Sequence, residues 1–104
     1  MKTKQQILVS IKSQVQQVLP DAEIILFGSR ANGVFTDESD WDILVLSDKP
    51  VTKKIKQTIH DKIFPLSVSI SSFINVLVVS RKDWQQNPSY YSLKKTIAFN
   101  NQPQ

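Results

Sequence analysis

The chain has 104 residues, of which 40% are hydrophobic and 21% charged, and its formal net charge is +4. This length supports one domain with a single modest core, so we expect one domain over residues 1–104. The absence of cysteine excludes disulfides, thiol nucleophiles and thiolate metal sites. No apolar stretch reaches membrane-spanning length and the N-terminus lacks a signal-peptide segment, so we expect a cytoplasmic location and no membrane partner.

Charge is divided unevenly along the chain. Residues 1–48 hold four basic and seven acidic residues, whereas residues 49–104 hold nine basic and two acidic ones. The basic half could attract a polyanion such as ATP, RNA or an acidic partner, or its lysines could simply keep exposed helix faces soluble. Basic and aromatic residues do not alternate as they do in proteins that stack nucleic-acid bases, so direct nucleic-acid binding is not expected.

The first half of the chain predicts a helix and two strands around a glycine turn. Thr3 and Gln6 form a capping-box pattern before apolar residues at helical spacing, which predicts a helix over about 4–19. Residues 23–27 are mostly apolar and predict a strand covered on both faces. Residues 28–33 predict a turn and a short helix, and residues 40–46 predict a second strand.

The second half predicts a helix, a strand and a helical end. Apolar residues recur every four positions from Val51 to Ile63, and Pro65 is expected to end this helix. Residues 67–71 alternate weakly like an exposed strand. We expect the remaining elements to be a strand over 73–79, a short helix from 81, a helix over 90–98 and a polar tail over about 100–104. This order indicates a small α/β or α+β two-layer domain.

Two carboxylates are the strongest candidates for chemistry. Asp40 and Asp42 are two residues apart on a strand and therefore point to the same face, whereas Trp41 points to the other and is expected in the core. Paired carboxylates suit Mg²⁺, which binds one or two of them together with substrate phosphates. The turn at Gly28 and Ser29 can present backbone N–H groups to an anion. Together these features predict phosphoryl or nucleotidyl transfer.

Other candidates leave alternatives open. Ser29 can donate to a phosphate or cap the short helix, and Arg30 can pair with phosphate or with Asp37 or Glu38. His60 is expected at the surface, because no second histidine completes a metal site.

The segment from Ile24 to Leu46 resembles the Gly-Ser and Asp-x-Asp signature of the DNA polymerase beta-like nucleotidyltransferase superfamily, and more narrowly its minimal nucleotidyltransferases. A weaker likeness runs from Ile74 to Trp84. The resemblance implies an α+β palm, with a small mixed β-sheet and helices packed on one face. It also implies that Asp40 and Asp42 bind Mg²⁺ or Mn²⁺.

The same resemblance implies roles for four further positions. Gly28, Ser29 and Arg30 would hold the nucleotide, with ATP as the substrate. The superfamily's third carboxylate falls on Asn75, whose amide cannot accept a proton. The alternative placements for that carboxylate are Asp48, Asp61 and Asp83.

The expected function is therefore transfer of AMP from ATP to an acceptor. The family likeness implies that the acceptor is a tyrosine of a HEPN-domain toxin, which the chain would silence as an antitoxin. The alternative is a weakened or inactive nucleotidyltransferase module that neutralises a protein partner by binding. A third class, RNA binding through Lys53, Lys54 and Lys56, ranks below both.

Overall fold

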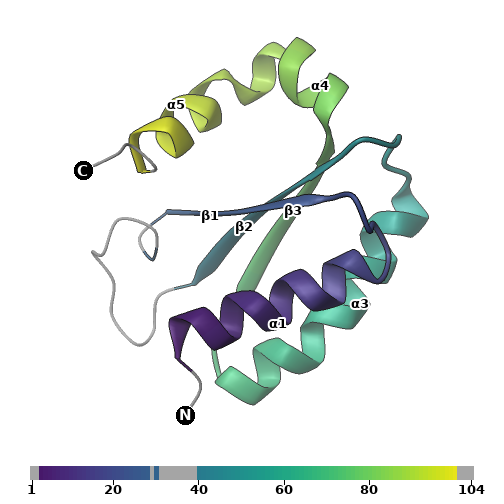
Figure 1. Cartoon of the computed structure of the whole chain (residues 1–104). Helices are drawn as coiled ribbons and strands as arrows, with labels where there is room; N and C mark the ends of the chain where they lie inside the picture. The colour runs from purple at the N-terminus through teal and green to yellow at the C-terminus, as the bar shows by residue number, and fades with distance from the viewer. Residues whose placement is uncertain (1–2, 29, 31–39, 101–104) are drawn as a thin grey trace.

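The computed structural model describes residues 3–28, 30 and 40–100 (Figure 1). Its elements in chain order are α1 (Lys4–Gln16), β1 (Glu23–Phe27), β2 (Trp41–Ser47), α3 (Lys53–Ile70), β3 (Ile74–Ser80), α4 (Arg81–Gln86), the 3₁₀ turn η1 (Pro88–Tyr90) and α5 (Tyr91–Asn100). The predicted order is confirmed for these elements. The short helix expected after Gly28 lies outside the described residues except for Arg30. None of the described helices is long and apolar enough to cross a membrane.

The three strands form a mixed sheet in the order β1-β2-β3. Strand β1 pairs antiparallel with β2, so that Phe27 lies opposite Asp42. Strand β3 pairs parallel with β2, so that Asn75 also lies opposite Asp42. The mixed sheet confirms the expected α+β class. It also places the end of β1 and the start of β3 on either side of the start of β2.

Helices lie on both faces of this sheet (Figure 1). Trp41, Ile43 and Val45 belong to the larger core cluster, which also holds the buried faces of α1 and α3. Leu44 and Leu46 alternate with them and join a smaller cluster with residues of β3, α4 and α5. The expectation of helices on one face is therefore correct for α1 and α3, whereas α4 and α5 pack on the other face. Because β2 is apolar on both faces, each face needs a cover.

Helix α3 continues past Pro65, so the prediction that this proline ends the helix was wrong. In the segment 67–71, which alternates weakly like a strand, residues 67–70 form the last helical turn and Ser71 is the cap that follows it. Leu66 is buried and Ile70 packs against the main core. We infer that this burial outweighs the one backbone hydrogen bond that a proline removes. The helix ends at Ser71, which takes the left-handed conformation with φ 54°.

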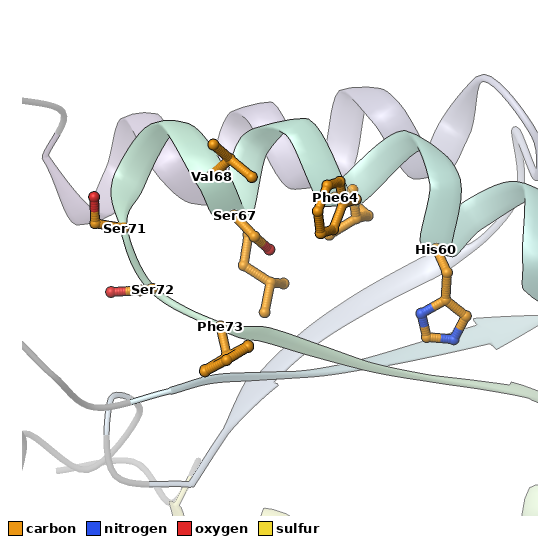
Figure 2. A pocket seen from close by; sticks show the side chains of 9 residues that line it. His60, Phe64, Ser67, Val68, Ser71, Ser72 and Phe73 are labelled. Carbon is orange, nitrogen blue, oxygen red and sulfur yellow. The ribbon is translucent and has the colours of Figure 1, made fainter.

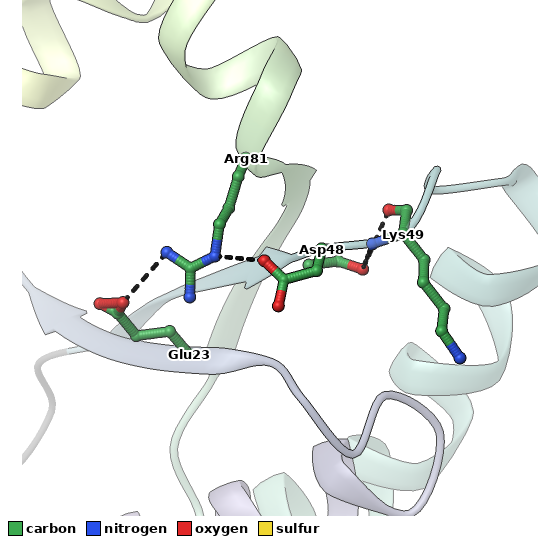
Figure 3. A network of polar contacts seen from close by, with 5 residues as sticks. Glu23, Asp48, Lys49 and Arg81 are labelled. Carbon is green, nitrogen blue, oxygen red and sulfur yellow. Dashed lines mark hydrogen bonds and ion pairs between the residues drawn. The ribbon is translucent and has the colours of Figure 1, made fainter.

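An ion-pair network connects the C-terminal helices to the sheet (Figure 3). Arg81, the first residue of α4, donates from Nε to Asp48 at 2.7 Å and from Nη1 to Glu23 at 3.2 Å. Glu23 begins β1 and Asp48 follows β2, so one guanidinium joins three segments. These hydrogen bonds, first that to Asp48, raise the pKa of Arg81 above its ordinary value.

Candidate functional site

Three polar side chains meet where β2 and β3 begin. The side-chain nitrogen of Asn75 donates to Asp40 Oδ2 and to Asp42 Oδ1, at 3.2 Å in each case. The parallel register fixes this meeting, because it sets Asn75 directly opposite Asp42. The structure thus brings the side chains of Asp40, Asp42 and Asn75 together.

Gly28 completes the arrangement from the end of β1. Its φ is +76°, a backbone conformation that glycine adopts without strain and other residues rarely adopt. A Cβ built at this position would collide with the Asp42 carboxylate. A side chain is therefore disfavoured here on two independent grounds, and the backbone lies close to the carboxylate.

The donor set fits a hard divalent cation. Asp40 and Asp42 offer carboxylate oxygens, and the amide of Asn75 can offer a third oxygen by rotating about its last bond. Among the described residues no group of three or more Asp, Glu, His or Cys could hold a metal. The third position is an amide, which here donates hydrogen bonds to both carboxylates and so offsets their mutual repulsion.

The alternative positions for a third carboxylate lie elsewhere. Asp48 follows the far end of β2 and binds Arg81. Asp61 on α3 accepts a hydrogen bond from Gln57, and Asp83 lies in the first turn of α4. None of the three is hydrogen-bonded to Asp40 or Asp42 in the part of the chain that the structure describes. Among these four candidates, Asn75 is the residue whose side chain is hydrogen-bonded to Asp40 and Asp42.

Arg30 and Ser29 are the other two residues predicted to bind the nucleotide, and the structure describes only Arg30. Arg30 is buried, and its guanidinium carbon lies 4.4 Å from the centroid of the Trp41 ring. Trp41 belongs to the core cluster on the α1 and α3 side, as expected, whereas Asp42 points to the other face. The structure thus places the Arg30 guanidinium against the ring of Trp41. Ser29, Asp37 and Glu38 lie outside the described residues.

Sequence reasoning missed two features. Nothing local pointed to the Arg81 network, because the partners Glu23 and Asp48 are 58 and 33 residues away. It also missed an exposed apolar groove beside α3, which His60 lines as a surface residue. The groove could not be foreseen while the helix was expected to end at Pro65.

Comparison with known proteins assigns the family. Residues 8–98 match the family model described as the nucleotidyltransferase domain, and this match spans most of the chain. The chain therefore belongs to the nucleotidyltransferase domain family. Over 56 residues it is 39% identical to a protein of Methanocaldococcus jannaschii named "Putative protein adenylyltransferase MJ0141", covering 52% of this chain and 57% of that protein.

Two solved structures resemble the fold. The Cid1 poly(U) polymerase, in a structure with MgGTP bound, aligns with a TM-score of 0.50 and 28% identity over 60% of this chain and 20% of its own. A cytoplasmic RNA terminal U-transferase aligns with a TM-score of 0.57 and 16% identity over 94% of this chain and 32% of its own. These likenesses confirm the nucleotidyltransferase fold. The chain spans about half the length of the M. jannaschii relative and a third or less of the two solved chains.

Proposed function

We propose that this chain transfers AMP from ATP to an acceptor in a Mg²⁺-dependent reaction. The observation that carries the proposal is the meeting of Asp40 and Asp42 with Asn75, beside a glycine whose backbone abuts Asp42. The name of the M. jannaschii relative and the MgGTP bound to the Cid1 polymerase support the same chemistry. The site geometry, the relative's name and the ligand of the solved structure all agree with a nucleoside triphosphate as the substrate.

The proposed roles follow from the chemistry of each group. Asp40 and Asp42 would hold the metal, which, when bound, neutralises charge on the triphosphate. Gly28 lets the backbone approach a phosphate closely, and Ser29 would donate its hydroxyl there. Arg30 remains a predicted contributor to nucleotide binding, although its guanidinium stacks on Trp41.

The transfer itself needs a proton acceptor that Asn75 cannot provide. The acceptor oxygen bonds to the α-phosphorus, the bond from that phosphorus to the β-phosphate oxygen breaks, and pyrophosphate leaves. The acceptor's proton must pass to water or to a group of the acceptor protein, because an amide takes no proton. An acidic hydroxyl therefore suits this site better than an alcohol.

A tyrosine satisfies that requirement. Its phenol has an ordinary pKa of about 10, well below that of an aliphatic alcohol, so it loses its proton more easily. This argument supports a tyrosine as the acceptor. The family resemblance alone suggests that the tyrosine belongs to a HEPN-domain partner, which this chain would silence as an antitoxin. Positioning and charge neutralisation supply much of the catalysis in such transfers, so an amide at the third position is compatible with activity.

Asn75 also favours a second candidate function. A module without a base could neutralise its partner by contact alone, with weak or no transfer. The retention of both Asp40 and Asp42 favours the enzyme, because two carboxylates this close are costly without a cation to bind.

One transfer assay separates the two functions. The purified chain is incubated with a HEPN-domain partner, Mg²⁺ and ATP labelled on the α-phosphate. We expect label on the partner, a loss of at least about a hundredfold in Asp42→Asn, and faster transfer in Asn75→Asp, which restores a proton acceptor. If no variant transfers label while all bind the partner equally, the chain is a binding module.

A further inference from the structure

An apolar groove of about 420 Å³ lies between the C-terminal half of α3 and the start of β3. Phe64, Val68 and Phe73 line it and remain 67%, 62% and 76% exposed. Figure 2 shows Phe64 and Val68 on the helix and Phe73 on the segment that leads into β3. Only two other large hydrophobic side chains among the described residues are comparably exposed. Such a cluster marks an interaction surface more often than scattered exposure does.

An open sheet edge adjoins the groove. Strand β3 is an outer strand of the described sheet and pairs with β2 on one side only. The Phe73 carbonyl accepts from the Trp41 amide. Because successive residues of a strand alternate, the backbone groups of Ile74 and Val76 face the open side. An exposed edge of this kind can pair with an added strand.

Positive charge continues the line of the groove along α3. Lys53, Lys56 and His60 precede Phe64 at intervals of three and four residues, which places them on the same side of the helix. Both lysines are exposed, and neither forms an ion pair with any residue that the structure describes. The surface thus passes from apolar at the C-terminal end of α3 to basic at its N-terminal end.

We propose that this groove binds an extended segment of a partner protein that carries apolar side chains in one half and acidic side chains in the other. The segment adds to β3 as a further strand, its apolar side chains contact Phe64, Val68 and Phe73, and its carboxylates meet Lys53 and Lys56. Charge disfavours a second copy of this chain, which carries +4 overall and presents the same basic surface. The inference goes beyond nucleotide transfer and does not depend on it.

A random peptide library displayed on phage and selected on the intact chain tests the proposal. We expect the selected peptides to combine apolar and acidic residues. Synthetic labelled copies should bind with an affinity that falls as salt rises. Phe64→Ser and Phe73→Ser should each weaken binding by about tenfold or more, and Lys53→Glu with Lys56→Glu should weaken it and reduce the salt dependence.

Folded controls keep the test decisive. The replaced side chains are mostly exposed, so circular dichroism should show native helix content in every variant. Val9→Ser removes an exposed apolar side chain on α1, outside the groove, and should leave binding unchanged. Selected peptides without acidic residues, or binding that ignores the phenylalanine changes, would overturn the proposal. So would a dimer, measured by light scattering, that dissociates in Phe73→Ser, because a second copy would then cover the groove.

Discussion

Asn75 lies opposite Asp42 across the parallel pair of β2 and β3, and its side-chain nitrogen is 3.2 Å from Asp42 Oδ1. The same nitrogen is 3.2 Å from Asp40 Oδ2. Two nearby carboxylates repel each other, and an N–H donor between them offsets that repulsion. The amide thus holds the two carboxylates together, and we expect the stability of the site to depend on this one side chain.

Asn75→Asp should destabilise the metal-free chain. It replaces a donor to both carboxylates with a third negative charge, which at an exposed site costs about 1–2 kcal/mol. Added Mg²⁺ should recover most of this loss, because three carboxylates bind a cation more tightly than two. Thermal unfolding in chelator and in Mg²⁺ measures both effects. Gln86→Glu adds the same charge on α4 and should show neither the destabilisation in chelator nor the recovery by Mg²⁺. Equal destabilisation in the two variants would show that the loss does not come from repulsion at the site.

Gly28→Ala should lower both stability and ATP affinity. The positive φ alone costs a residue with a Cβ about 1–2 kcal/mol, and the new methyl group also displaces the Asp42 carboxylate. Chemical denaturation of a double-mutant cycle separates these causes. In an Asp42→Ala background the collision is absent, so Gly28→Ala should cost only the backbone strain. The same cost in both backgrounds would show that Gly28 and Asp42 are not coupled.

Arg81→Met should weaken the attachment of α4 to the sheet. It removes the hydrogen bonds to Asp48 and Glu23 while keeping most of the apolar stem. The guanidinium is well exposed, so we expect a small fall in the unfolding temperature that shrinks as salt is added. Lys82→Met, one residue along and without an ion pair among the described residues, is the matched control. A fall in unfolding temperature that does not change with salt would mean that Arg81 stabilises the fold by packing and not by its ion pairs.

Tyr90 should make stability depend on pH in the alkaline range. Burial, reinforced by the nearby Asp83 carboxylate, raises the pKa of the Tyr90 phenol above its ordinary value of about 10. The fold thus favours the neutral phenol. This contribution is complete below about pH 10 and is lost as pH rises through the higher folded pKa.

Comparison of two tyrosine variants tests this dependence. The unfolding free energy of Tyr90→Phe should fall less between neutral pH and about pH 11 than that of the unchanged chain. Tyr91→Phe, at an exposed neighbouring position, should follow the unchanged chain. Identical pH profiles for all three proteins would contradict the burial argument.

Local patterns predicted β1, β2 and β3 as strands, because each is a short apolar run. Only the family resemblance pointed to Asn75, and the parallel register of β2 and β3 is what sets it opposite Asp42. Local patterns did not predict α3 beyond Pro65, since local propensity says nothing of the burial of Leu66 and Ile70. The stacking of Arg30 on Trp41 was missed for a similar reason. It depends on which face of the sheet the residues after β1 reach, and the sequence does not specify that.

Asp40 and Asp42 are proposed to form a metal-dependent nucleotide site. The most direct test is a calorimetric titration of ATP into the purified chain, with Mg²⁺ and with chelator, beside the same titrations of Asp42→Asn. We expect ATP binding to require Mg²⁺ and to weaken by at least about tenfold in Asp42→Asn. Binding that is equal with and without the metal, or unchanged in Asp42→Asn, would contradict this proposal.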